Sequence, residues 1–487
     1  MRKKRIFYFN DARHYYLFVF EPPIKIEDAW TPIDEISGTS VNSFSYGVER
    51  GDGMFYPSKV GMQFGTNIQP FDQAAYWRTW NNMQSLIDRG YDPLKLLIDR
   101  AHDKNLDFFA SLRLGSYGGM DPSLDTKTGG HGYVNKEVRD HVYEVLKELV
   151  NDYDTDGIEL DFAAPPGGAS FYFQPEDVPK NTQLMTDWVK QVSDMTRNLN
   201  NTGKEIGARI YPTKAANEAA GLDIDEWIEQ KLIDFVVPMV YGHHIIDPDM
   251  PIDWLIKSAH DKDISVYPMI SPYYSDDSRT HLNRQYATPE MIRAATSNYW
   301  YKTVDGMYTW FLSWPLGNAE HRILSELGNP TLSEKGDKHY IVRRSNQYME
   351  IHNIDCSLPL NIPSDSISDP HSITFYISDN IIKESEKISS IELNINIKDL
   401  VSKDRLSFSL NGKSLSNEEV IRTPSDKISP YVGQWLKFRL KTVRPKIGSN
   451  TLQIMLHGRP EGLKSTLVVE DVEIIIRRGL YPASISS

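Results

Sequence analysis

The sequence predicts an α/β protein: a (β/α)8 TIM barrel over residues 1–330, a linker over 331–345 and an antiparallel β-sandwich over 346–487. Two observations lead to this prediction. Short β-rich runs alternate with segments of helical periodicity through the first two-thirds of the chain, a pattern typical of parallel βα units. Beyond residue 328 the helical periodicity ends, and turn signals separate alternating strand-like runs.

The first part contains eight candidate strands. They are residues 14–23, 43–50, 107–114, 157–162, 206–212, 235–242, 265–272 and 306–313. Helical segments lie between them: Val138, Val142, Leu146 and Leu149 share one face of the helix before the fourth strand, while Thr288 is placed to cap the helix before the eighth strand. Eight βα units in about 330 residues are typical of a TIM barrel with inserted loops.

The second part begins after the polar, turn-rich run "GNPTLSEKGDKH". Its strand-like runs are "SITFYIS", "SIELNINI", "LSFSLNG", "LKFRLK", "TLQIMLHG" and "TLVVEDVEIII". Asn411-Gly412 and Gly448-Ser449-Asn450 are turn signals between them. These features favour an antiparallel β-sandwich.

Composition excludes several classes of protein. The formal net charge is −13 and no Lys/Arg cluster is present, so a nucleic-acid groove is not expected. Cys356 is the single cysteine, which excludes an intramolecular disulfide. No stretch is long enough to span a membrane, and the apolar run "IFYF" is too short for a signal peptide. We therefore expect a cytoplasmic protein, or an exported one lacking its signal; the oligomeric state is open.

The run "DTDGIELDF" places two carboxylates on a buried strand. Strand residues alternate in direction, so Glu159 and Asp161 face into the barrel, with Asp161 at its mouth. Buried carboxylates are costly unless they are paired, and the inward register offers Arg113, Arg209 and Tyr211 as partners. Held ionised there, Asp161 is suited to be a nucleophile or a stabiliser of an oxocarbenium ion. For Glu159, we favour a structural ion pair with Arg113 over a substrate contact.

The run "YVNKEVRDHVYEVLKELVNDYDTDGIELDF" resembles a segment of glycoside hydrolase-like TIM-barrel proteins, with a looser similarity from about residue 10 to 325. The resemblance implies that the last Asp of its "DG-x-x-x-D" motif, Asp161, is catalytic or polarises substrate. Chitinase-like enzymes extend the motif to a Glu where this chain has Ala163, so the proton donor must come from elsewhere. The C-terminal runs look like galactose-binding-like sandwiches appended to glycosidases, and we expect this one to buttress the barrel.

Glycosidases of this kind need a second carboxyl group, one of the two being protonated near neutral pH. Glu49 is the first choice, because it ends the second strand at the mouth. Glu21 would end the first strand, although a loop-anchoring hydrogen bond beside Pro22 explains it equally well. Other candidates lie in turn-like contexts where Asp usually caps: Asp247, Asp249, Asp276 and Asp277.

Aromatic side chains are frequent near strand ends, where flat rings and polar tips suit sugars. The expected substrate-binding residues are Glu21, Arg113, Glu159, Arg209, Tyr211, Tyr241, His243, Tyr267, Trp310 and Trp314. Adjacent His243 and His244 point in opposite directions on an extended segment, so a metal site is not expected. No cofactor is expected either.

The sequence thus predicts a glycoside hydrolase acting on a poly- or oligosaccharide, with Asp161 as lead catalytic carboxylate and Glu49 as its partner. Two alternatives stay open. One is a non-catalytic carbohydrate-binding barrel, which the loss of an acid at Ala163 favours. The other is a polysaccharide lyase that uses Tyr and Arg on an acidic sugar.

Overall fold

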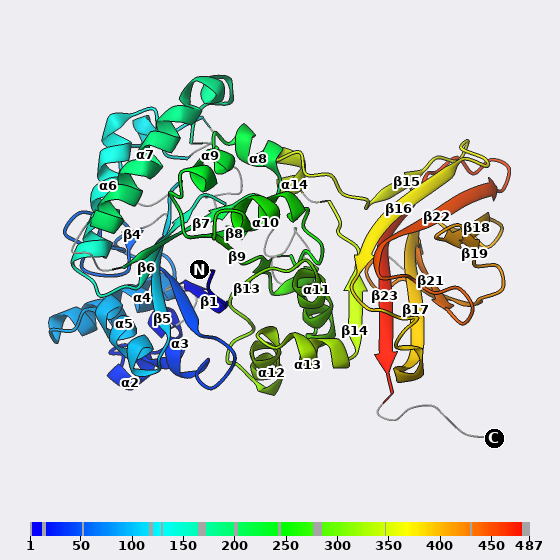
Figure 1. Ribbon diagram of the computed structural model, residues 1–487, viewed down its shortest axis with the longest axis horizontal. Helices are drawn as coiled ribbons and strands as arrows, with labels where there is room; N and C mark the ends of the chain where they lie inside the picture. The colour runs from blue at the N-terminus through cyan, green and yellow to red at the C-terminus, as the bar shows by residue number, and fades with distance from the viewer. Residues whose placement is uncertain are drawn as a thin grey trace.

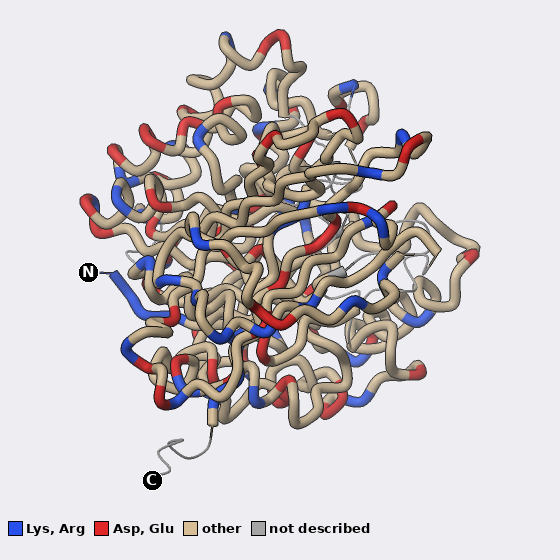
Figure 2. The backbone as a smooth tube through the Cα atoms, turned by 90° about the vertical axis from the view of Figure 1, so that its right-hand side faces the viewer, with Lys and Arg blue, Asp and Glu red and all other residues tan. Residues whose placement is uncertain are grey.

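The computed structural model describes most of the chain. The described residues are 2–11, 16–50, 53–115, 120–127, 130–163, 172–198, 203–241, 245–275, 285–345, 347–428 and 431–479. No helix within these ranges combines the length and hydropathy needed to cross a membrane. On the face drawn in Figure 2, described Lys and Arg residues are interspersed with Asp and Glu rather than gathered in a stripe.

A large parallel sheet curls through the first part of the molecule (Figure 1). Among the described residues it has nine strands, in the order β10 (Met269–Ile270), β13 (Gly306–Thr309), β1 (Arg5–Asp11), β2 (Ser43–Gly47), β5 (Asp107–Arg113), β6 (Gly157–Asp161), β7 (Glu205–Ile210), β8 (Phe235–Pro238) and β9 (Ser265–Val266). The strands at the two ends of this order, β9 and β10, are separated in the chain by Tyr267 and Pro268 only.

Helices connect these strands and lie outside the curled sheet (Figure 1). They are α1 (Tyr16–Val19), α2 (Ile26–Ala29), α3 (Thr31–Asp34), α4 (Ala74–Asp88), α5 (Pro93–Asp103), α6 (Lys136–Asn151), α7 (Val178–Asn198), α8 (Lys214–Ala219), α9 (Ile224–Glu229), α10 (Asp253–His260), α11 (Pro289–Tyr301) and α12 (Asn318–Leu327). Two predictions are confirmed here. Helix α6 buries Val138, Val142, Leu146 and Leu149, and the Thr288 side chain accepts a hydrogen bond from the Met291 amide at the start of α11.

The prediction for the first strand is wrong. The strand is β1, at residues 5–11, whereas part of the run 14–23 forms the short helix α1. Both runs are aromatic, but every residue of β1 is buried, as a strand covered on both faces requires. The run 14–23 instead contains Pro22 and Pro23, which cannot donate to a sheet ladder.

Two other predicted strands are interrupted. The run 43–50 divides into β2 and the short β3 (Glu49–Arg50), which pairs in antiparallel fashion with β4 (Gly53–Met54). The run 265–272 divides into β9 and β10 at Pro268, which has no amide hydrogen for the ladder. A separate hairpin of β11 (Tyr273–Ser275) and β12 (Gln285–Tyr286) follows.

An aromatic layer fills the inside of the curled sheet. Phe7 lies with its ring centroid 5.2 Å from those of Phe109, Tyr267 and Tyr308 and 5.3 Å from that of Phe235. Gly207 makes room for this layer, because a Cβ there would lie 2.1 Å from the Phe235 ring. The layer separates the polar groups at the two ends of the strands.

The C-terminal part consists of two antiparallel sheets. Within the described chain, the larger has six strands: β14 (Lys338–Ile341), β15 (Leu360–Ile362), β17 (Ile388–Lys398), β20 (Glu419–Pro424), β21 (Gly433–Arg439) and β23 (Leu467–Arg478). The smaller has four: β16 (Pro370–Ile377), β18 (Arg405–Leu410), β19 (Lys413–Ser414) and β22 (Gly448–Gly458). Buried residues of both sheets, such as Ile395 and Ile454, belong to one apolar cluster.

Of the two turns predicted in this part, one is confirmed and one is not. Asn411 and Gly412 have positive φ angles, 51° and 78°, and join β18 to β19 as predicted. Gly448-Ser449-Asn450 is not a free turn, because these residues begin β22. Residues 331–345, the expected linker, include most of α13 (Pro330–Lys335) and all of β14.

Candidate active site

Polar side chains gather at the carboxyl end of the parallel sheet. The register places Arg113 of β5 opposite Asp161 of β6, and Asp161 opposite Arg209 of β7. Asp11 ends β1, and Glu49 lies just beyond β2. We call Asp11, Glu49, Arg113, Glu159, Asp161 and Arg209 the carboxyl-end cluster.

Arg209 is the centre of this cluster. Its Nη1 donates to Asp161 Oδ2 at 3.0 Å, while Nε and Nη2 donate to Glu159 Oε1 at 2.9 and 2.6 Å. The guanidinium carbon lies 4.1 Å from the ring centroid of Phe9 and 5.1 Å from that of Trp310. All three charged side chains have zero exposure, so Arg209 bridges two fully buried carboxylates.

Glu159 lies one layer below Asp161, as predicted, but its partner is different. Besides Arg209, Ser111 Oγ and the Tyr308 hydroxyl donate to Oε1, at 2.7 and 3.0 Å. Oε2 is buried and has no hydrogen-bond partner among the described residues. Burial raises the pKa of Glu159, against the opposing charge of Arg209. The predicted ion pair with Arg113 is wrong, because Arg113 Nη2 binds Asp11 Oδ2 at 2.8 Å instead.

Glu49 is buried beside Arg113 and two other carboxylates. Its Oε1 accepts a hydrogen bond from the Arg113 backbone amide at 3.0 Å, and within the described chain its buried Oε2 has no partner. Burial raises the pKa of Glu49 well above its usual range; Asp11 and Asp161 raise it further, while Arg113 opposes the rise. Burial and the neighbouring carboxylates thus favour the protonated form of Glu49.

The cluster holds more acids than bases. In the described part of the chain its four carboxyl groups meet two guanidinium groups. Buried carboxyl groups that lie close together raise one another's pKa values. Burial is the main cause that raises the pKa values of Glu49 and Glu159, and neighbouring carboxylates add to it.

Asp11 is the functional candidate that the sequence analysis missed. Its carboxylate is 1% exposed and pairs with Arg113. It was missed because the first strand was placed after it, at residues 14–23. The signal was nonetheless present, since "RIFYFND" ends an alternating strand with an inward acid, as "GIELD" does.

The structure corrects the expectation that Asp161 is open at the mouth. Its relative exposure is 0% and that of Glu49 is 1%. Asp161 Oδ1 accepts a hydrogen bond from the Ala163 amide at 3.2 Å, and its charge acts on the phenols of Tyr172 and Tyr211. The carboxylate is thus enclosed by the backbone that follows β6 and by side chains from more distant segments.

Tyr211, Trp310 and Tyr241, which were predicted to bind substrate, lie near this cluster, whereas Trp314 contacts other residues. Tyr211 and Trp310 directly follow β7 and β13, and both are 1% exposed. Tyr241 is half-buried, and its interaction with the charge of Arg113 places it beside that residue. Trp314 is half-buried against Phe20 and hydrogen-bonds Glu35.

Two predicted site residues lie elsewhere. Glu21 is exposed and pairs with Arg78 at 2.6 Å, and the strand that it was expected to end does not exist. Tyr267 donates its hydroxyl to the Lys3 carbonyl at 2.7 Å, at the amino end of the sheet. Its ring belongs to the aromatic layer, which makes it part of the core. His243, with His244, Asp276 and Asp277, lies outside the described residues.

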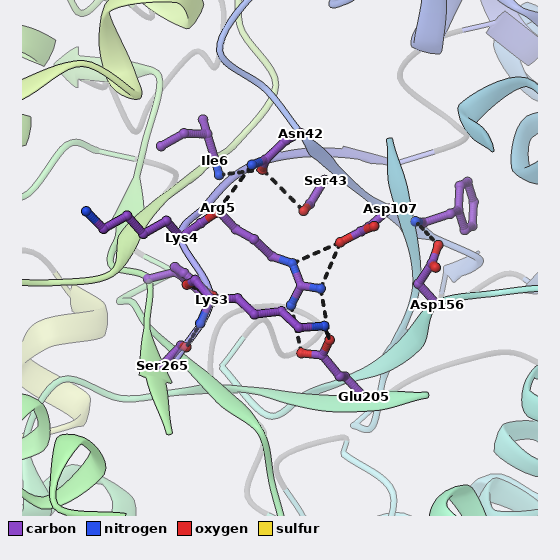
Figure 3. Close-up of polar contacts among 12 residues, drawn as sticks. Lys3, Lys4, Arg5, Ile6, Asn42, Ser43, Asp107, Asp156, Glu205 and Ser265 are labelled. Atoms are coloured by element: carbon purple, nitrogen blue, oxygen red, sulfur yellow. Dashed lines mark hydrogen bonds and ion pairs between the residues drawn. The ribbon is translucent and has the colours of Figure 1, made fainter. Parts of the chain in front are cut away.

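The amino end of the sheet carries a second charged cluster, formed by Lys3, Arg5, Asp107 and Glu205 (Figure 3). Arg5 donates to Asp107 Oδ2 from Nε and Nη2, at 3.0 and 2.7 Å. It also donates to both oxygens of Glu205, at 2.7 and 2.9 Å, and Lys3 Nζ binds the same carboxylate. These hydrogen bonds lower the pKa of Glu205 despite its burial. We call this group the amino-end cluster.

Metal ligands are not assembled in the described ranges. No group of three or more His, Cys, Asp or Glu residues there is arranged to hold a metal ion. The carboxyl and guanidinium groups of the carboxyl-end cluster can donate a proton, stabilise charge and, as a carboxylate, attack as a nucleophile.

Comparison with known proteins gives distant likenesses. No family model matches the chain. Glycosyl hydrolase YngK of Bacillus subtilis (strain 168) is 22% identical over 291 residues, covering 48% of this chain and 53% of that protein. Glycosyl hydrolase DigH of Escherichia coli (strain K12) is 21% identical over 265 residues, covering 43% and 56%. The chain spans about half the length of these curated relatives.

Among solved structures, α-L-fucosidase isoenzyme 2 from Paenibacillus thiaminolyticus matches 69% of this chain and 50% of that one, with a TM-score of 0.45 and 12% identity.

Proposed function

We propose that the chain is a glycoside hydrolase that acts on a poly- or oligosaccharide at the carboxyl-end cluster. The observation that carries the proposal is the contrast between two of its carboxyl groups. Burial raises the pKa of Glu49 well above its usual range, which favours its protonated form, whereas Asp161 is paired to Arg209 at 3.0 Å. Glycosidases need such a pair, one acid and one carboxylate. The two curated relatives named glycosyl hydrolases support the same reaction class.

In this mechanism Glu49 donates its proton to the glycosidic oxygen as the bond to the anomeric carbon breaks. Asp161 faces the positive charge that develops on the sugar ring, either as nucleophile or as stabiliser of the oxocarbenium ion. Water then adds to the anomeric carbon, displacing Asp161 if a covalent bond has formed, and returns a proton to Glu49. Arg209 and Arg113 hold the carboxylates in position. Because Asp161 has no exposed surface, the groups that cover it must move aside when a sugar enters.

We also propose that the curled sheet is a closed (β/α)8 barrel. In this interpretation β9 and β10 are two halves of one strand, which would join the ends of the sheet order and give eight strands in total. The two antiparallel sheets with their common apolar cluster support a β-sandwich after it. Residues 1–330, 331–345 and 346–487 are the proposed barrel, connection and sandwich, with β14 of the connection pairing into the six-stranded sheet of the sandwich.

Release of new reducing ends tests the proposed function. Wild type and Asp161→Asn are incubated with a panel of purified polysaccharides and oligosaccharides. We expect the wild type to release reducing ends from at least one glycan, and the variant to release none above background. No release from any glycan by the wild type, or equal release by both proteins, contradicts the proposal.

Complete burial of Asp161 favours one second candidate, a carbohydrate-binding protein without turnover. In that case the carboxyl-end cluster is a structural ion-pair network. Calorimetry with the same glycan panel separates the two candidates. Binding that is unaltered by Asp161→Asn, together with no product, identifies the non-catalytic protein.

A further inference from the structure

A segment from the C-terminal part of the chain returns to the parallel sheet. Residues 347–356, which contain α14 (Gln347–Ile351), lie between β14 and β15, and both of these strands belong to the six-stranded sheet. Yet Met349 and Ile354, each 4% exposed, pack into the apolar core of the parallel-sheet part. Figure 1 shows α14 on the parallel-sheet side of the molecule. We call residues 347–356 the returning segment.

Arg343 fixes the returning segment to the loop that follows β8. Its Nη1 donates to Asp247 Oδ2 at 3.3 Å and to the Asp249 carbonyl at 3.2 Å. Its Nη2 donates to the Asp355 carbonyl at 2.9 Å, near the far end of the segment. Cys356 Sγ also lies 3.2 Å from Met349 Sδ, which holds the two ends of the segment together.

The returning segment meets the candidate site through His352. Its imidazole centroid lies 4.1 Å from the ring centroid of Tyr211, with 35° between the planes. The two residues are 3% and 1% exposed. Burial lowers the pKa of His352 to about 4, so at neutral pH a neutral ring stacks on Tyr211.

The Tyr211 hydroxyl is a buried donor without an acceptor among the described residues. Buried polar groups are normally hydrogen-bonded, and one that is not calls for an explanation such as a missing ligand. Burial raises the pKa of Tyr211 and the charge of Asp161 raises it further, in keeping with the position of Tyr211 two residues after Arg209, which pairs with Asp161. An oxygen of a ligand bound at Asp161 would meet the Tyr211 O–H.

We propose that the returning segment forms one wall of the substrate pocket, and that His352 is a positioning residue that holds Tyr211 so that its hydroxyl donates to a sugar hydroxyl beside Asp161. This inference rests on the proposed function and goes further, because it makes the C-terminal part of the chain a contributor to the site. His352 itself acts only through Tyr211.

Kinetics on a glycan that the wild type hydrolyses test the inference. The variants are Tyr211→Phe, His352→Ala, His352→Phe and the double variant His352→Ala/Tyr211→Phe. The matched control is His457→Ala, which removes an exposed imidazole of β22. Thermal unfolding of each variant is measured alongside, to establish that it is folded.

Loss of a hydrogen bond to a buried site should make Tyr211→Phe about 10- to 100-fold lower in kcat/KM. Loss of the ring contact should make His352→Ala about two- to tenfold lower, mainly through KM, while His352→Phe keeps the contact and stays within about twofold of wild type. The double variant should be no worse than Tyr211→Phe, because residues that act through one another are not additive. The control should equal wild type.

Wild-type kinetics in Tyr211→Phe, or full additivity in the double variant, overturn the inference while the hydrolase function stands. If His352→Ala does not fold, the variants His352→Phe and Tyr211→Phe still test the inference. A lowered kcat/KM in His352→Phe together with a wild-type kcat/KM in Tyr211→Phe also overturns the inference. No turnover by the wild type on any glycan is the separate result that removes the proposed function, and this inference with it.

Discussion

The two ends of the parallel sheet differ in how their charges are balanced. At the amino end, Lys3 and Arg5 satisfy two carboxylates, and the pKa of Glu205 is lowered (Figure 3). At the carboxyl end, two guanidinium groups face four carboxyl groups in the described part of the chain, and the pKa values of Glu49 and Glu159 are raised. The first arrangement suits a stable closure of the sheet. The second leaves carboxyl groups whose pKa values are raised, an arrangement that is frequent at reaction sites and that fits the proposed function.

The largest expected effect is a difference in kcat between variants at the carboxyl end and at the amino end of the sheet. Asp161→Asn should lower kcat by about 10⁴-fold, because the amide cannot attack or stabilise a developing cation. Asp107→Asn, its counterpart in the amino-end cluster, should change kcat by less than about twofold, since the aromatic layer separates it from the site. Steady-state rates on the hydrolysed glycan measure both. A comparable loss in the two variants would remove the functional distinction between the ends.

Loss of Arg209 should lower the free energy of unfolding more than loss of Arg5. Arg209→Met leaves two carboxylates of zero exposure without their cation, at a cost of about 3–5 kcal/mol in the free energy of unfolding. Arg5→Met leaves Asp107 and Glu205, whose side chains are 43% and 16% exposed and can be partly solvated, so we expect about 1–2 kcal/mol. Urea titration at pH 7 gives both values. Equal losses would contradict the difference in burial on which the comparison depends.

Removal of the proton donor should affect rate and stability in opposite directions. Glu49→Gln cannot protonate a leaving group, so kcat/KM should fall by about 10²- to 10³-fold. The same change replaces an acid that resists ionisation with a neutral amide of the same shape, so the free energy of unfolding at pH 8 should rise by about 1 kcal/mol. Rates and urea titrations on one preparation provide the comparison. A variant that is both slower and less stable at pH 8 would argue that Glu49 is a structural anion.

The smallest expected effect is a difference in pH dependence between the ends. The pKa of Glu205 is lowered in the folded state, so its contribution is present above the usual carboxyl value of 4.5 and is lost as pH falls below it. The pKa of Glu49 is raised, so its contribution is present below 4.5 and is lost as pH rises. Thermal unfolding from pH 2 to 9 should show a flatter acid limb in Glu205→Gln and a flatter alkaline limb in Glu49→Gln. The same limb flattened in both variants would refute the assignment.

The sequence was sufficient where pattern and register act locally. Glu159 and Asp161 lie on β6 as the alternation in "GIELDF" predicts, and Arg209 comes to them from the next strand. The prediction of the first strand is wrong because "IFYF" and "YYLFVF" follow one another and both are rich in β-forming aromatic residues. With the strand placed at 14–23, Asp11 falls outside it and is not recognised as a strand-end carboxylate. Tyr267 was assigned to the mouth because the effect of Pro268, which interrupts the strand, was not foreseen.

Enclosure of the site could not be predicted from local pattern. Tyr172 comes to Asp161 from a point eleven residues along the chain, and His352 reaches Tyr211 from the C-terminal part. Contacts between such distant segments depend on tertiary packing, which periodicity does not encode. For the same reason the sequence could place Glu49 at a strand end but could not show that burial raises its pKa.

Infrared spectroscopy of the carboxylic acid C=O stretch tests the central claim without any need for a substrate. The spectrum of Glu49→Gln is subtracted from that of the wild type at pH 7, and the measurement is repeated in D2O. We predict a positive band of one protonated carboxyl group that shifts on deuteration and belongs to Glu49. A difference spectrum that shows only the carboxylate bands of an ionised Glu49 would contradict the account.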